Sequence, residues 1–165
     1  MTSTLEPDTA TAAVTATPQQ RADAWLTRFD AALTAGDPRA VSELFAVDSF
    51  WRDLVAFTWN LKTVEGREQI AGMLDARLAD TGPTGWRTAE EATGADGDVV
   101  EAFIEFETAV GRGDGHLRLR PGPDGQDQAW TLLTTLQELK GHEEPNGHRR
   151  PLGAVHGSDP DRRSW

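Results

Sequence analysis

The sequence of 165 residues contains no cysteine and no tyrosine. The absence of cysteine excludes disulfide bonds, thiolate catalysis and metal sites with cysteine ligands. No apolar run approaches the ~20 residues that cross a bilayer, and the N-terminus lacks the basic and apolar regions of a secretory signal. We therefore expect one soluble, cytoplasmic domain with no membrane partner.

Basic residues are scarce as well. There are 16 Lys and Arg against 27 Asp and Glu, which gives a formal net charge of −11. Nucleic acids and anionic membranes are bound through basic surfaces, so neither is an expected partner.

Composition divides the chain into three parts. Residues 1–17 are rich in Thr and Ala without an apolar period, and they are predicted to be a disordered leader. Residues 141–165 are rich in Gly and Pro and resemble a linker. The folded domain is therefore expected at 18–140.

Three helices are predicted in the first half of this domain. The first carries an apolar stripe at helical spacing, made of Ala22, Trp25, Leu26, Phe29 and Leu33. Asp37-Pro38 predicts the start of a second, short helix with a stripe of Val41, Leu44 and Phe45. The third is predicted to start at Gly66 and to end at Thr81-Gly82-Pro83.

Strands are predicted between and after the helices, at 50–59, 86–93, 99–110, 116–120 and 128–139. The connections contain turn residues, notably Asp96-Gly97, Gly111 to Gly115 and Pro121 to Gly125. Short connections between strands indicate antiparallel neighbours. The predicted fold class is α+β, with a curved antiparallel sheet and three helices in the N-terminal half.

Three short segments carry a family resemblance: Leu44 to Asp48, Phe50 to Asp53, and Gly66 to Ile70. We interpret the first as the end of the second helix, the second as the start of a strand, and the third as the start of the last helix. Their order and spacing resemble the nuclear transport factor 2, ketosteroid isomerase and SnoaL-type cyclase group. The resemblance implies a cone-shaped, cystatin-like fold. It leaves function open, because such folds host binding modules and enzymes alike.

A narrower resemblance extends into the C-terminal part. Trp51 to Trp59, Leu132 to Pro145 and Arg149 to Gly153 resemble the N-terminal extension of some bacterial and fungal flavin-containing monooxygenases. In those proteins the extension precedes the domains that bind FAD and NADP. The resemblance implies an accessory domain that works with a flavin-monooxygenase domain in cis or in trans.

The chain itself is not expected to bind FAD or NADP. A dinucleotide site needs G-x-G-x-x-G between a strand and a helix. Gly111, Gly113 and Gly115 fail this spacing, because His116 stands where the last glycine is needed. We interpret the three glycines as a hairpin turn, and expect these cofactors only if a further domain supplies their site.

Asp53 is the leading candidate for catalysis. By its distance from Leu44 to Ala46 it matches the catalytic aspartate of ketosteroid isomerases. A carboxylate in an apolar cone could act as a general base at carbon. The same enzymes use a tyrosine in the oxyanion hole, which this chain lacks. The alternative is a structural Asp53 that pairs with an arginine or accepts backbone N–H groups.

Large aromatic side chains are the candidates for a ligand pocket. Alternation along 50–59 places Trp51, Phe57 and Trp59 on one face with Asp53. Trp25 and Phe29 of the first helix could close this pocket, and Phe106 could add to it from its own strand. The alternatives are an ordinary core or a dimer surface.

The remaining polar candidates lie on two later strands. Glu101, Glu105 and Glu107 share one face of strand 99–110, without the histidines that would suggest a metal site. We therefore predict no metal ligands and expect His116, Arg118 and Arg120 to pair with these glutamates across strands. His116 is the second candidate for acid–base catalysis.

Two functions follow from these observations. The first is an accessory domain of a flavin-monooxygenase-like protein that binds a hydrophobic small molecule or mediates dimerisation, with a homodimer expected. The second is a free-standing SnoaL-like isomerase, cyclase or hydratase for a hydrophobic small molecule, with Asp53 as base.

Overall fold

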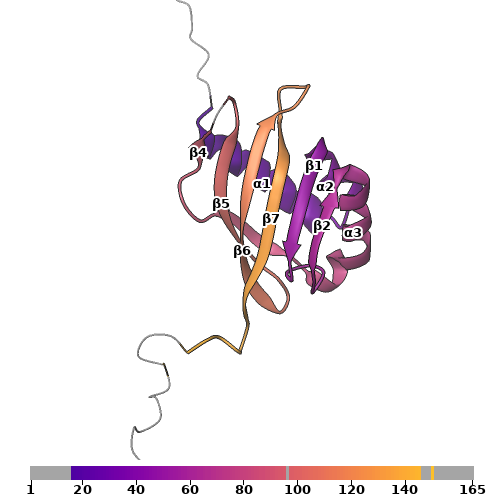
Figure 1. Cartoon of the computed structure of the whole chain (residues 1–165), viewed down its shortest axis with the longest axis vertical. Coiled ribbons are helices and arrows are strands. Elements are labelled where there is room, and N and C mark those ends of the chain that lie inside the picture. Colours follow the sequence, from indigo (N-terminus) through magenta and orange to yellow (C-terminus); the bar gives the residue numbers. More distant parts are fainter. Residues whose placement is uncertain (1–15, 96, 146–149, 151–165) are drawn as a thin grey trace, which may run out of the picture.

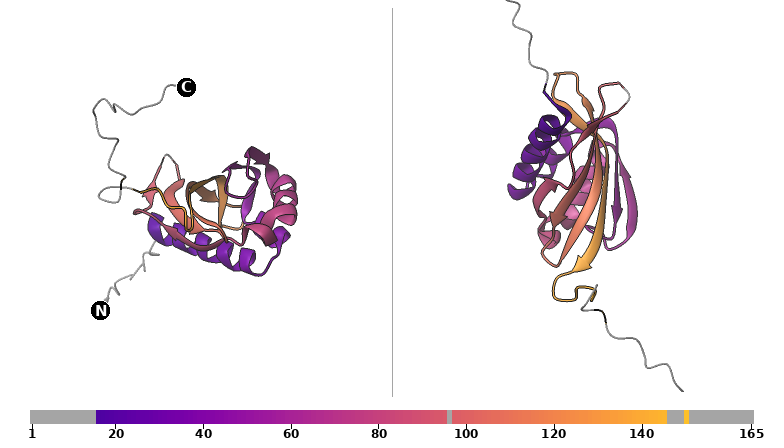
Figure 2. Two further views of the ribbon diagram at one scale, coloured as in Figure 1. Left: turned by 90° about the horizontal axis from the view of Figure 1, so that it is seen from below. Right: turned by 90° about the vertical axis from the view of Figure 1, so that its left-hand side faces the viewer.

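The computed structural model describes residues 16–95, 97–145 and 150. Almost all of the predicted leader and most of the predicted tail lie outside the described residues, so both stay predictions. In the described part the helices lie on one side of a strongly curved, open sheet (Figures 1 and 2), which confirms the predicted α+β class. None of the helices described there has the length and apolar character needed to cross a bilayer.

Helix α1 spans Pro18–Thr34 and buries the predicted stripe. Thr17 caps it by accepting from the Gln20 N–H, while the Gln20 side chain accepts from the Thr17 N–H. This reciprocal pair satisfies two backbone donors that a helix start leaves free. The start of α1 is therefore encoded locally, and its direction is set by its buried face.

Helix α2 spans only Pro38–Glu43, and strand β1 follows at Phe45–Leu54. The prediction that Leu44 to Asp48 ends a helix is therefore wrong, although the Asp37 cap is confirmed. The carbonyl of Leu44 accepts hydrogen bonds from the Trp25 indole (3.0 Å) and the Ala129 N–H (2.9 Å). Because these tertiary donors occupy Leu44, the chain leaves the helix one residue before Phe45.

The strand predicted at 50–59 is also displaced. Strand β1 ends at Leu54, a loop occupies 55–60, and a short edge strand that the sequence did not predict, β2, spans Leu61–Glu65. Alternation along β1 does bury Trp51 and Asp53 together. It stops before Trp59, which lies on the loop and is 60% exposed.

Helix α3 spans Gly66–Thr81, as predicted, and ends on Gly82 in the left-handed conformation that glycine favours. Its buried side chains are Ile70, Met73, Leu74, Leu78 and Thr81. Helix α3 packs on β1 and β2, whereas α1 packs mainly on β3 and β5. The helices therefore cover different parts of the same concave face.

The remaining strands complete the sheet. They are β3 (Thr84–Thr88), β4 (Thr93–Gly94), β5 (Val100–Glu107), β6 (Gly111–Pro121) and β7 (Asp127–Leu139). Their order is β2-β1-β7-β6-β5-β3, with β4 paired to β5. All pairs are antiparallel except β1 with β7, which places the first strand beside the last in the middle of the sheet.

The predicted hairpin turn at Gly111 to Gly115 is wrong, because these residues form the first half of β6. The turn lies just before them, where Thr108 N–H donates to the Gly111 carbonyl (2.8 Å). A Cβ atom at Gly113 would lie 2.5 Å from the ring of Phe106 and 2.6 Å from the Thr135 carbonyl oxygen. The glycines therefore allow neighbouring strands and a buried ring to approach β6 closely.

This packing predicts opposite effects of alanine at two glycines. Gly113→Ala should lower the free energy of unfolding by about 1–3 kcal/mol, because its methyl group overlaps Phe106 and backbone. Gly72→Ala in α3 should raise it by up to about 1 kcal/mol, since nothing lies within 4 Å of the added Cβ and alanine favours helix. Urea unfolding measures both, and an unchanged midpoint for Gly113→Ala would contradict the assignment of 111–115 to a packed strand.

Candidate functional site

Asp53 lies near the end of β1 and is fully buried. Its Oδ2 accepts from the Thr58 N–H (2.8 Å) and the Thr58 hydroxyl (2.7 Å), and both oxygens lie within hydrogen-bond distance of the Phe57 N–H (3.1 and 3.2 Å). Its Oδ1 also accepts from the Thr134 hydroxyl (2.9 Å). A carboxylate has about four acceptor positions. Three of these donors bond only to Asp53, and the single proton of the Thr58 hydroxyl is shared with the Asn60 carbonyl at 3.0 Å.

Thr134 connects this carboxylate to the core. Asp53 and Thr134 are register partners on the parallel strands β1 and β7. The Thr134 hydroxyl donates to Asp53 and accepts from the Trp51 indole N–H at 2.9 Å. The two strands are therefore joined by buried hydrogen bonds between the side chains of Trp51, Thr134 and Asp53, in addition to their backbone hydrogen bonds.

The loop after Asp53 is strained. Val55 and Trp59 have positive φ angles of 60° and 54°, which non-glycine residues rarely adopt, β-branched ones least of all. Each such residue costs about 1–3 kcal/mol. Hydrogen bonds from Phe57 and Thr58 to the Asp53 carboxylate offset this cost, as does the Val55 N–H bond to the Asn60 carbonyl (3.1 Å). Asp53 therefore holds the loop in a conformation its own residues do not favour.

The candidate pocket aromatics form a packed cluster. Trp25 stacks on Phe29 with ring centroids 4.6 Å apart, and Trp51 meets Phe57 edge to face at 5.0 Å. Each of these rings is at most 1% exposed, as is Phe106. The structure therefore brings five of the six predicted residues together, and they fill the interior of the cone by contacting one another. Trp59 is the sixth and lies outside the cluster.

Two further rings belong to this cluster but were not predicted for the pocket. Phe45 stacks on Trp51 (5.7 Å), and Trp86 stacks on Phe106 (4.4 Å). The Trp86 indole N–H is buried without a hydrogen-bond partner among the described residues. Phe45 was predicted to belong to the second helix, and Trp86 stands at the start of a predicted strand. The sequence therefore did not show that either ring faces the interior of the sheet.

His116 lies on the opposite face of the sheet from Asp53. It is the register partner of Leu133, whereas Asp53 pairs with the adjacent Thr134, whose side chain points the other way. The pKa of His116 is lowered, mainly because the ring is partly buried. The negative charge of Glu101 raises this pKa and the positive charge of Arg118 lowers it, both to smaller extents. Its ring packs against Phe103 at 5.0 Å. The structure therefore does not combine His116 and Asp53 into one site.

The expected charge pairing on this outer face is found in part. Arg118 lies 2.8 Å from Glu101 across β5 and β6. Arg120 instead pairs with Asp48 of β1, and His116 faces Phe103. In residues 16–95 and 97–145, no group of three or more His, Asp or Glu side chains is arranged to hold a metal ion.

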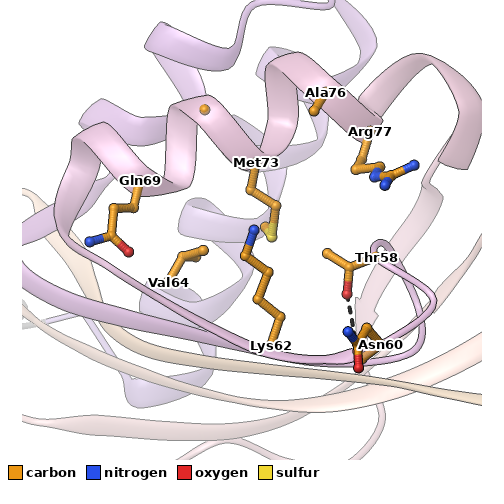
Figure 3. Close-up of a pocket in the computed structure, with 9 residues that line it drawn as sticks. Thr58, Asn60, Lys62, Val64, Gln69, Met73, Ala76 and Arg77 are labelled. Atoms are coloured by element: carbon orange, nitrogen blue, oxygen red, sulfur yellow. Dashed lines mark hydrogen bonds between the residues drawn. The ribbon is translucent and has the colours of Figure 1, made fainter.

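A groove of about 430 Å³ lies between α3 and β2, beside the loop that Asp53 holds. Figure 3 shows α3 as one wall and β2 with the loop as the other. Its lining combines small, apolar and uncharged polar residues with two cations: Thr58, Asn60, Lys62, Val64, Gln69, Gly72, Met73, Ala76 and Arg77. The groove does not follow from the sequence, because one of its walls, β2, was not predicted.

The geometry predicts a structural role for Asp53. Asp53→Asn should lower the free energy of unfolding by about 1.5–3 kcal/mol or more, because the amide cannot accept from all four donors. The matched change Asp48→Asn on the same strand should have little effect, because Asp48 is exposed and its ion pair is on the surface. Urea unfolding of both variants measures the difference, and equal stabilities would argue against the role assigned to Asp53.

No protein-family model matches the sequence, and no curated protein matches it. Solved structures do match. One is an NTF2-like protein with a cystatin-like fold from Novosphingobium aromaticivorans, which is 21% identical with a TM-score of 0.54; the match covers 73% of this chain and 82% of that chain.

Two further solved structures are also similar in fold at low sequence identity. A ketosteroid isomerase-like protein from Erwinia carotovora atroseptica is 12% identical, with a TM-score of 0.59 over 73% of this chain and 96% of that one. A protein from Novosphingobium aromaticivorans named as a proposed aromatic ring hydroxylase is 17% identical, with a TM-score of 0.59 over 74% and 91%. At these identities the likeness concerns the fold, and the chain has the NTF2-like, cystatin-like fold that its sequence predicts.

Proposed function

We propose that this chain is a non-catalytic accessory domain that binds a hydrophobic small molecule and works with a flavin-monooxygenase-type catalytic domain. The observation that carries the proposal is the set of hydrogen bonds that the Asp53 carboxylate accepts. A general base needs a free acceptor position within hydrogen-bond reach of the substrate. Both oxygens of Asp53 already accept hydrogen bonds, from the backbone or side chains of Phe57, Thr58 and Thr134.

The cone interior supports the same proposal. Enzyme and ligand pockets are commonly clefts with a few polar groups among apolar walls. Here the predicted walls contact each other, since Trp51 lies against both Phe45 and Phe57, and Trp86 lies against Phe106. The proposed ligand site is therefore the groove between α3 and β2.

The catalytic partner is proposed from the sequence. The segments Trp51 to Trp59 and Leu132 to Pro145 resemble the N-terminal extension of flavin-containing monooxygenases. One protein of the same fold is named as a proposed aromatic ring hydroxylase, which agrees with an oxygenase context. FAD and NADP would then be bound by the catalytic domain, in cis or in trans, and not by this chain.

A homodimer through the outer face of the sheet is part of the proposal. Phe50 and Phe103 point to this face and are 41% and 57% exposed. Trp130 lies beneath the guanidinium groups of Arg118 and Arg120, at 5.3 and 5.6 Å. Aromatic rings and arginine are enriched in the cores of protein interfaces.

The dimer is tested by Phe103→Lys. An added charge at a dimer contact is costly to bury, so the variant should sediment as a monomer at concentrations where the original chain is a dimer. Ala24→Lys, at an exposed position of α1 on the other side of the sheet, serves as a control for added charge alone. A monomeric original chain, or a dimer that Phe103→Lys leaves intact, would exclude this surface.

The absence of catalysis by Asp53 is tested with a β,γ-unsaturated ketone. A base at carbon would convert it to the conjugated isomer, which absorbs in the near ultraviolet. We expect the original chain and Asp53→Asn to leave the buffer rate unchanged. An acceleration by the original chain that falls about 10²-fold or more in folded Asp53→Asn would establish the competing function, a SnoaL-like isomerase with Asp53 as base.

A further inference from the structure

We propose that the groove between α3 and β2 binds a small organic acid, with its carboxylate held between Lys62 and Arg77 and its apolar body on Val64 and Met73. The inference rests on the proposed function, because it names the chemical class of the ligand that the accessory domain takes. The volume of about 430 Å³ falls within the range of ~300–1,000 Å³ that is usual for small-molecule sites.

The two cations enter the groove from opposite walls. Lys62 is the register partner of Asp53, so its side chain lies on the inner face of the sheet, toward α3. Arg77 extends from α3 on the side of Thr58 (Figure 3). The floor of the groove is formed by the apolar side chains of Val64 and Met73, with Met73 beside Lys62 and Val64 on the side away from Arg77 (Figure 3). An acid with one charged and one apolar end matches this division.

The charges in the groove are unpaired. Neither Lys62 nor Arg77 forms an ion pair in the part of the chain that the structure describes, and no Asp or Glu lines the groove. This is a local reversal in a chain whose net charge is −11. A guanidinium offers a carboxylate two parallel N–H donors, and an ammonium adds a point charge, so the pair selects a carboxylate over a neutral group.

Gly72 keeps the helical wall open. A Cβ added there meets nothing within 4 Å, so no packing in the described structure requires glycine. Glycine in a helix interior costs about 1 kcal/mol relative to alanine. A side chain at this position would project into the space between α3 and β2, which makes Gly72 a suitable position for blocking the groove without unfolding the helix.

The experiment is calorimetric titration of the whole chain with 2-naphthoate and with 2-naphthamide, which has the same shape but no charge. We expect saturable binding of naphthoate at one site and at least about tenfold weaker binding of the amide. Lys62→Gln and Arg77→Gln should each weaken naphthoate by about tenfold, as expected for loss of a charge-assisted hydrogen bond. Arg52→Gln, on the outer face of neighbouring β1, is the matched control and should change nothing.

Gly72→Leu separates the possible failures. It should abolish naphthoate binding while the protein stays folded by circular dichroism. A second outcome is that the original chain binds naphthoate and naphthamide equally and Gly72→Leu binds neither. The groove is then a site without preference for a carboxylate, so the inference is wrong and the proposed function stands. If naphthoate binds but ignores Gly72→Leu, the groove is not the site. If neither compound binds, Lys62 only protects an edge strand from pairing, and the ligand-binding part of the proposed function fails with the inference.

Discussion

The buried carboxylate of Asp53 links the end of β1 both to β7 and to the loop 55–60, in addition to the backbone hydrogen bonds between these segments. It fixes the end of β1 to β7 through Thr134, and it fixes the loop 55–60 through Phe57 and Thr58. That loop carries the strained residues Val55 and Trp59, and it leads into β2. Removing the carboxylate would leave buried N–H and O–H donors without partners, which is more costly than losing an exposed charge. The Asp53 side chain thus contributes to the position of β2, which also pairs along its length with β1, and to the groove against α3.

The aromatic cluster gives this arrangement a functional consequence. Rings from α1, β1, β3 and β5 fill the interior that a ligand would occupy in an open cone. A filled interior stabilises the domain through burial of apolar surface, and it supports the proposal that Asp53 does not act on a substrate. Binding is then expected on the outside, where α3 and β2 diverge. The same fold can thus serve as a binding domain when its interior is packed and its edges are open.

Much of the fold could be predicted because its signals are local. Helix α3 has glycine at its start and just after its end, with its large apolar residues at helical spacing, and the alternation in β1 correctly placed Trp51 and Asp53 on one buried face. The errors have a tertiary cause. Gly111 to Gly115 have the composition of a turn, and only the approach of Phe106 and β7 makes them a strand.

The candidate site was harder to predict than the fold. Alternation shows which residues share a face, but it cannot show whether the space before that face is empty, because rings from other elements decide this. Edge strand β2 gave no alternating signal, since Val64 is its single buried residue. Without β2, neither the inward position of Lys62 nor its opposition to Arg77 could be foreseen. Thr134 was missed as a partner of Asp53 because it is 81 residues away and only the pairing of β1 with β7 brings it close. Thr58 was missed because a continuous strand at 50–59 would place it on the opposite face from Asp53.

The most direct test of a structural Asp53 is native-state hydrogen exchange at the backbone amides of Phe57 and Thr58. Amides of irregular, partly exposed loops usually exchange through small local openings. If their acceptor is a buried carboxylate tied to two strands, both amides should be protected nearly as well as those of central strand β7. Exchange as fast as that of a fraying loop would contradict the account, because the Asp53 carboxylate would then be free to meet a substrate.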